Sequence, residues 1–232
     1  MRIAMWSGPR NLSTAMMYAF GNRQDFAAWD EPFYAAYLAE TGIPHPMLSR
    51  ILEESETAPE LVAERCSGPI PEGKPHFYMK HMPHHMLEGF PLGWAEHCVN
   101  IHLIRHPARV VASYAAKREE VTVDDVGYRQ QAELFQRFPG PVIDSSDVRR
   151  DPEAVLSKLC ADIGLSFDST MLSWAAGPKS YDGPWASHWY NAVHKSTGFA
   201  EAEGPIPELS GHEATIAAAS MEYYEAMRSK AA

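Results

Sequence analysis

Short apolar runs and longer amphipathic segments alternate along this chain. The short runs are typical of buried strands in a parallel sheet, and the longer segments repeat their apolar positions with the period of an α-helix. Strands are expected at Ile3–Trp6, Phe26–Trp29, Phe77–Lys80, Asn100–Ile104 and Pro141–Ile143. Helices are expected at Ser13–Asn22, Pro107–Glu119, Val123–Phe138, Pro152–Ile163 and Glu213–Arg228. The alternation predicts an α/β fold in which helices connect the strands of a parallel sheet.

Two segments depart from this alternation. The stretch from Phe33 to Lys74 holds several prolines with short helical pieces between them, and Gly177–Phe199 is irregular and rich in aromatic residues. A cap over a substrate cleft explains the first segment, and a surface excursion without a role is the alternative. Its length favours the cap. We expect one domain over residues 1–232 with a substrate cap at about 33–75.

Composition and charge restrict the classes of protein that the chain can represent. The net charge is −10, which argues against a protein that coats nucleic acid or an anionic membrane. No apolar run approaches the roughly 18–20 residues that a membrane span needs, and the N-terminus does not resemble a secretory signal. The cysteines, Cys66, Cys98 and Cys160, form no zinc-binding pattern. We therefore expect reduced thiols and a cytoplasmic protein.

The segment from Gly8 to Thr14 joins the first expected strand to the first helix and is a candidate anion-binding loop. A turn there presents backbone N–H groups and a helix N-terminus to an anion, while Arg10 adds a planar cation and Ser13 and Thr14 add hydroxyl donors. A Gly-Pro turn with Ser13 as an N-cap is the structural alternative. The loop is not a Walker A motif, because Leu12 stands where that motif requires lysine.

A second group of polar residues surrounds the turn after the fourth expected strand. Arg105 ends the strand, Pro107 begins the next helix, and Ser113 lies two turns along that helix. Arg105 and Ser113 are therefore placed to meet one phosphate group. A lone arginine at a strand end is more often part of a surface ion pair, but the spacing to Ser113 favours the phosphate site.

These two groups together resemble the sulfotransferases that use 3′-phosphoadenosine-5′-phosphosulfate. Pro9-Arg-Asn-Leu-Ser-Thr14 is similar to the family's first loop, Pro-Arg-Ser-Gly-Thr-Thr. Arg105, Pro107, Ser113 and Tyr114 match its 3′-phosphate motif, and Asp147 to Asp168 resembles a later Asp-Pro and Leu-Gly-Leu region. The resemblance implies a P-loop NTPase-like three-layer α/β fold with a parallel central sheet flanked by helices and a helical cap insertion. The bacterial branch is the nearer match.

The resemblance also implies roles for individual residues. The residues expected to bind the donor nucleotide are Gly8, Pro9, Arg10, Asn11, Leu12, Ser13, Thr14, Arg105, Ser113 and Lys195. Arg10 is expected to stabilise charge on the sulfonate. Leu12 stands where the family commonly has glycine, so a positive φ at this position would strain the backbone. No resident metal is expected.

Two residues are candidates for the base that accepts the acceptor's proton. Glu31 follows the second expected strand, where several bacterial sulfotransferases place a catalytic glutamate, and His81 resembles the catalytic histidine of the cytosolic branch. We prefer Glu31. His84 and His85 lie close to His81, but Pro83 interrupts the helix on which the three would have to bind a metal.

The aromatic segment contains a further set of candidates. Trp185, Trp189 and Tyr190 would either stack on adenine or on the acceptor, or pack in the core. The favoured function is transfer of a sulfonate to a hydroxyl or amine acceptor that the sequence does not identify. The alternatives are a P-loop-like kinase or other phosphotransferase, and a nucleotide-binding pseudoenzyme.

Overall fold

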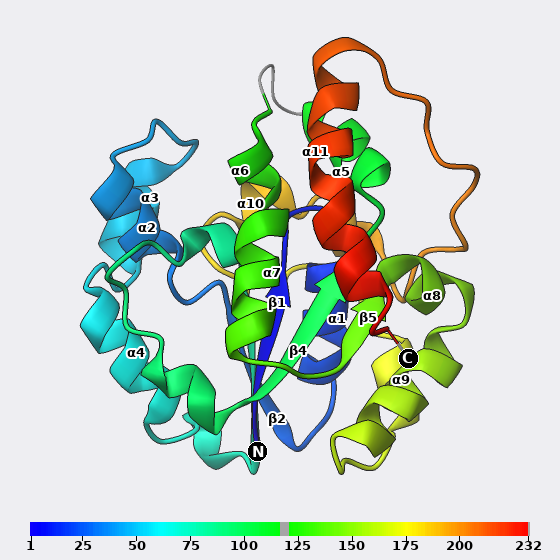
Figure 1. The fold of residues 1–232 in the computed structure, drawn as a ribbon. Helices are drawn as coiled ribbons and strands as arrows, with labels where there is room; N and C mark the ends of the chain where they lie inside the picture. Colours follow the sequence, from blue (N-terminus) through cyan, green and yellow to red (C-terminus); the bar gives the residue numbers. More distant parts are fainter. Residues whose placement is uncertain (117–120, 232) are drawn as a thin grey trace.

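The computed structural model describes residues 1–116 and 121–231 and contains one parallel sheet with the strand order β2-β3-β1-β4-β5 (Figure 1). The strands are β1 (Arg2–Ser7), β2 (Phe26–Asp30), β3 (His76–His81), β4 (Val99–Ile104) and β5 (Val142–Asp144). Every expected strand is present, with each end within one residue of its prediction. Short apolar runs bounded by turns are therefore a sufficient signal for the strands of this sheet.

Helices connect the strands and continue beyond them. They are α1 (Ser13–Gly21), α2 (Tyr34–Thr41), α3 (Leu48–Glu54), α4 (Pro59–Ser67), α5 (Pro107–Ala115), α6 (Val123–Val126), α7 (Tyr128–Arg137), α8 (Ser145–Arg150), α9 (Pro152–Asp162), α10 (Ala186–Trp189) and α11 (Gly211–Arg228). Short 3-10 turns are η1 (Pro71–Gly73), η2 (Pro83–His85), η3 (Gly93–His97), η4 (Ser169–Leu172) and η5 (Val193–Lys195). Within the described ranges, no helix has the length and apolar content needed to cross a membrane.

Two expected helices differ from those observed. The helix expected at Val123–Phe138 is divided into α6 and α7, because Gly127 adopts a φ of 71°, outside the range of a right-handed helix. The helix expected at Pro107–Glu119 ends at Ala115 in the described part of the chain, and residues 117–119 lie outside it. The start of α9 is as predicted, since the Asp151 side chain accepts a hydrogen bond from the Ala154 amide.

Alternate residues of the strands face opposite layers of helices. Ile3, Met5 and Tyr78 belong to the core beneath α1 and α9, whereas Trp6 and Met79 belong to the core beneath α4 and α7. Figure 1 shows α7 and α11 in front of the sheet and α1 behind it. Both faces of the sheet are covered, so the three-layer α/β fold is confirmed.

The segment expected to form a cap, residues 33–75, leaves the carboxyl end of β2 and returns at the start of β3. It forms α2, α3, α4 and the short turn η1. Because every pair in the sheet is parallel, all five strands end at the same edge. The order reverses at β1, which lies between β3 and β4. Ligands of open parallel sheets bind at such a reversal, outside the carboxyl ends of the strands.

Candidate active site

The loop from β1 to α1 has a backbone shape suited to an anion. Arg10 and Leu12 have φ values of 62° and 75°, and Leu12 is the N-cap of α1. Alternation between left-handed and right-handed residues turns successive N–H groups towards one side of the chain, as in anion-binding nests. Leu12 therefore occupies the conformation for which glycine is favoured, at a cost of roughly 1–2 kcal/mol. Because Leu12 is the N-cap, Ser13 is not, contrary to the structural alternative for this loop.

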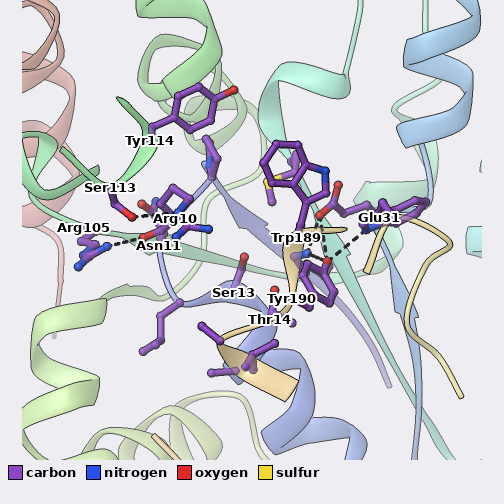
Figure 2. A pocket seen from close by; sticks show the side chains of 18 of the residues that line it. Arg10, Asn11, Ser13, Thr14, Glu31, Arg105, Ser113, Tyr114, Trp189 and Tyr190 are labelled. Atoms are coloured by element: carbon purple, nitrogen blue, oxygen red, sulfur yellow. Dashed lines mark hydrogen bonds and ion pairs between the residues drawn. The ribbon is translucent and has the colours of Figure 1, made fainter. Parts of the chain in front are cut away.

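Gly8 and Arg10 fix this loop against the rest of the protein. A Cβ atom at Gly8 would lie 2.6 Å from the carbonyl oxygen of Val126, so only glycine fits. Arg10 Nε donates to Ser113 Oγ over 2.9 Å, and Arg105 Nη1 donates to the Arg10 carbonyl over 2.7 Å. Burial, with the nearby charge of Arg105, lowers the pKa of Arg10 from an ordinary value so high that the side chain remains a cation. The loop thus brings two guanidinium groups to one side (Figure 2).

A cavity of about 470 Å³ opens at this edge of the sheet. Most of the predicted site residues line it: Pro9, Arg10, Asn11, Leu12, Ser13, Thr14, Glu31, Arg105 and Ser113. Gly8, His81 and Lys195 are not among the described residues that line it. Figure 2 shows Arg10, Arg105 and Ser113 on one side of the cavity, with Glu31, Trp189 and Tyr190 on the other.

A buried lysine holds two carboxylates on the second side. Lys80 Nζ donates to Asp30 Oδ1 over 2.8 Å, to Glu31 Oε1 over 2.6 Å and to Tyr190 Oη over 2.6 Å. The side chains of Lys80 and Asp30 are fully buried, and that of Glu31 is 8% exposed. Glu31 has a φ of 41°, an uncommon conformation for a residue other than glycine. Such strained residues concentrate at functional sites.

The ionisable side chains around Lys80 shift one another's pKa values. Burial alone would lower the pKa of Lys80, but the carboxylates of Asp30 and Glu31 raise it above its ordinary value. Burial raises the pKa of Asp30, and the nearby Glu31 adds to this effect while Lys80 opposes it. Burial also raises the pKa of Tyr190 well above its ordinary range, so its hydroxyl keeps its proton. The group therefore holds a lysine cation beside two carboxyl groups, and that of Glu31 lines the cavity.

His81 lies away from the cavity. Its ring packs 4.9 Å from Trp6 and 4.6 Å from Trp94, in the core on the far face of the sheet. Complete burial lowers the pKa of His81 to about 3, so the ring is neutral at pH 7. Lys80 and His81 are adjacent in β3 and therefore face opposite sides of the sheet. The structure brings Glu31, and not His81, to the cavity.

His85, a further histidine of this region, stacks on two tyrosines. His85 lies parallel to Tyr34 with ring centroids 4.5 Å apart and contacts Tyr37 at 4.8 Å. Burial, with the charges of neighbouring groups, lowers the pKa of His85 well below its ordinary value. Across residues 1–116 and 121–231, no three His, Cys, Asp or Glu side chains are grouped so that they could hold a metal ion.

The aromatic candidates pack in the core and also line the cavity. Trp185 and Tyr190 are 4% and 7% exposed and belong to the main core, yet both line the cavity, as does the more exposed Trp189. Trp185 Nε1 donates to Tyr190 Oη over 3.2 Å, and the Trp185 ring meets Tyr34 edge to face. This end of the cavity is therefore walled by rings held rigidly by the core.

Arg105 belongs to a cluster of arginines around a single carboxylate. Arg105 Nε and Arg149 Nη1 donate to Glu203 Oε1 over 3.0 Å and 2.8 Å, and Arg109 Nε lies 3.2 Å from Glu203 Oε2. Arg105 Nη2 also contacts Glu203 Oε1. The arginines come from the end of β4, from α5 and from α8. One carboxylate facing three guanidinium groups leaves a net charge of +2 beside the cavity.

Sequence reasoning missed several residues of this site, among them Lys80, Arg149 and Glu203. Lys80 was named only as the last residue of an expected strand, although a lysine inside an apolar strand is itself a signal of a buried ion pair. Arg149 and Glu203 lie 44 and 98 residues from Arg105 along the chain. Their local sequences contain no motif that would connect them to it, so only the tertiary structure shows this cluster.

Comparisons with known proteins identify the family. The model described as "Sulfotransferase domain" matches residues 1–231. Two Arabidopsis thaliana proteins, branched-chain-amino-acid aminotransferase-like proteins 2 and 1, are each 36% identical to this chain over 208 and 205 residues, 87% and 85% of it. The chain spans about a third of the length of these curated relatives, because the matched part is 36% of each.

Solved structures share the fold. The sulfotransferase domain of the Synechococcus PCC 7002 olefin synthase matches with a TM-score of 0.54 and 18% identity, covering 94% of both chains. The sulfotransferase domain from the curacin biosynthetic pathway matches with a TM-score of 0.51 and 15% identity, covering 95% of this chain and 97% of that one. With the family match over nearly the whole length, this chain belongs to the sulfotransferase-domain family.

Proposed function

We propose that the chain transfers a sulfonate from 3′-phosphoadenosine-5′-phosphosulfate to a hydroxyl or amine acceptor. The observation that carries the proposal is the shared cavity. One side offers a nest-shaped loop with Arg10, and the other offers the carboxylate of Glu31 held by Lys80. A cation for the transferred group and a base for the acceptor are the two chemical requirements of this reaction.

The donor would lie across the β1–α1 loop. In this proposal the loop amides, Arg10 and the hydroxyls of Ser13 and Thr14 bind the 5′-phosphosulfate, at the N-terminus of α1. Arg105 and Ser113 bind the 3′-phosphate. Support for this assignment comes from the contacts that join Arg10 to both of them. Lys195 is exposed and outside the cavity lining, so it is not assigned to the donor.

The proposed transfer is a displacement at sulfur. The acceptor oxygen or nitrogen forms a bond to sulfur while the bond from sulfur to the bridging phosphate oxygen breaks. The electron pair of the broken bond stays on the 5′-phosphate of adenosine 3′,5′-bisphosphate, where Arg10 offsets the developing charge. Glu31 accepts the proton that the acceptor loses. The sulfonate keeps its three terminal oxygens throughout.

Glu31 is preferred as the base on geometry and on charge. It lines the cavity, whereas His81 packs on the other face of the sheet. Lys80 holds Glu31 Oε1, while Oε2 lies 3.9 Å from His85 Nδ1, a ring that burial keeps neutral. Lys80 and His85 therefore orient the carboxylate, as a reactive geometry requires.

Turnover by matched variants tests the proposal. Labelled donor would be offered with a panel of phenols, aliphatic alcohols and amines, and the accepted compound would then be used with Glu31→Gln and His81→Asn. Glu31→Gln should lower kcat by about 10²–10⁴-fold, because glutamine keeps the shape of the side chain but accepts no proton. His81→Asn should cost less than tenfold per folded molecule. A dead His81→Asn beside an active Glu31→Gln would contradict the assignment of the base.

A further inference from the structure

The segment before α11, residues 200–210, has no regular secondary structure and is attached to the protein mainly through arginines. Most of its residues are exposed, and it runs outside the helices as the orange trace in Figure 1. Arg149 Nε donates to the Glu201 carbonyl over 2.7 Å, and Arg109 Nη2 donates to the Gly204 carbonyl. Between these contacts the Glu203 side chain turns inward and is only 4% exposed. We call this segment the 200–210 strap.

Glu203 occupies the edge of Arg105 that would grip a phosphate. A guanidinium binds a planar or tetrahedral oxyanion best through two parallel N–H groups. In Arg105 the Nε and Nη2 groups both contact Glu203 Oε1, while Nη1 donates to the Arg10 carbonyl. The edge formed by Nε and Nη2 is therefore already taken by a carboxylate from the same chain.

The cavity beside this ion pair has further donors for an oxyanion. Arg105, Arg149, Ser113 and Ser145 all line it. Ser145 is fully buried, and its hydroxyl has no hydrogen-bond partner among the described residues. Without Glu203 the three arginines carry a charge of +3, which a phosphate dianion offsets further than the single negative charge of Glu203 does.

We propose that Glu203 is an internal competitor for the donor's 3′-phosphate, and that binding of this phosphate displaces Glu203 and releases the 200–210 strap. The inference rests on the proposed function in one respect, namely that Arg105 receives the 3′-phosphate. Glu203 is then a residue that sets donor affinity and specificity. The carboxylate screens the arginines from anions that carry too little charge to replace it, and the complete donor is selected by its extra phosphate.

Binding measurements on a matched pair of variants test this competition. Glu203→Gln removes the negative charge but keeps the shape, whereas Glu201→Gln removes the same charge from an exposed side chain two residues away. Adenosine 3′,5′-bisphosphate should bind Glu203→Gln roughly tenfold more tightly than wild type, since charge-assisted hydrogen bonds are about twice as strong as neutral ones. AMP affinity should change less than twofold, and Glu201→Gln should resemble wild type with both ligands.

Hydrogen exchange of the 200–210 strap gives a readout that needs no nucleotide. Without ligand, its amides should exchange faster in Glu203→Gln than in Glu201→Gln, because the three arginines lose the charge that binds them to the strap. In wild type, the bisphosphate should speed the same amides and AMP should not. Unchanged exchange in Glu203→Gln would show that Glu203 does not hold the strap and would overturn the inference.

The outcomes separate this inference from the proposed function. If the bisphosphate binds wild type and loses affinity in Arg105→Ala, but binds Glu203→Gln no more tightly, the phosphate site stands and the competition is wrong. If AMP and the bisphosphate bind wild type and Glu203→Gln with equal affinity, the arginine cluster recognises no 3′-phosphate even without the competing carboxylate. That result overturns both the inference and the donor named above. Thermal unfolding of each variant confirms that it is folded.

Discussion

Replacing Lys80 should destabilise the protein far more than replacing a surface lysine, because Lys80 balances two buried carboxylates. In Lys80→Met the side chain keeps most of its length but loses its charged end. The side chains of Asp30 and Glu31 are only 0% and 8% exposed. In the variant they remain buried without the Nζ group that donates to them over 2.8 Å and 2.6 Å. Removing one partner from a buried ion pair costs about 3–5 kcal/mol. For a domain of this size, that corresponds to a fall in Tm of roughly 6–20 °C.

Urea unfolding of wild type, Lys80→Met and Lys158→Met measures this cost. Lys158 is the matched control, because it pairs with Asp162 one helical turn away but its side chain is 53% exposed. Solvent screens that pair, so Lys158→Met should change the free energy of unfolding by less than about 0.5 kcal/mol. If Lys80→Met lost no more stability than Lys158→Met, the ionic network at Glu31 would not exist as described.

The pH dependence of this difference provides a second check. Burial already raises the pKa of Asp30 in the folded protein, and removing Lys80 should raise it further. Above the pKa of unfolded Asp30, the folded variant then binds more protons than the unfolded chain, so its stability increases as the pH falls. The stability gap between wild type and Lys80→Met should therefore narrow from pH 8 to pH 5. A gap that widened towards pH 5 would contradict an uncompensated buried carboxylate.

Two further predictions concern His81 and Leu12. Burial lowers the pKa of folded His81 to about 3, so the unfolded chain binds a proton below pH 6.5 that the folded protein does not, and stability falls as the pH falls. Between pH 7 and pH 5 the free energy of unfolding of wild type should fall by about 2 kcal/mol more than that of His81→Phe. If the two free energies changed equally with pH, the burial of a neutral ring would be refuted. Because Leu12 has a φ of 75°, Leu12→Gly should be more stable than Leu12→Ala by about 1 kcal/mol in urea unfolding. The usual order, with alanine the more stable, would mean that the loop is not left-handed at this position.

Local sequence patterns predicted the sheet well, because each strand is a short apolar run with an obvious turn after it. The helices of the segment expected to form a cap, α2 to α4, were predicted only as short helical pieces, because prolines interrupt the apolar period there. The break at Gly127 was missed because α6 and α7 share one amphipathic pattern across it. The glycine at position 127 was the sequence signal that would have located the break, because glycine readily adopts the left-handed conformation that ends a helix.

The candidate site was predicted in part. Residues close to strand ends were found from their position, and Arg10, Arg105, Ser113 and Glu31 do meet at one cavity. His81 was placed at the site by its resemblance to a motif, whereas the alternation of side chains along β3 would have placed it with Phe77 and Met79 on the other face. Contacts that join distant segments, such as that of Glu203 with Arg105, depend on the whole fold and carry no local signal.

Calorimetric titration with adenosine 3′,5′-bisphosphate and with AMP, in the absence of magnesium, tests the central claim most directly. The claim is that Arg105 and Ser113 recognise a 3′-phosphate at the cavity that holds Glu31. One set of charge-assisted hydrogen bonds contributes about 1.5–3 kcal/mol, so the bisphosphate should bind wild type roughly tenfold to a hundredfold more tightly than AMP. Because the bisphosphate must displace Glu203, the ratio of the two affinities should be near tenfold, and Arg105→Ala should abolish the difference. Equal affinities of wild type for the two nucleotides would contradict the claim.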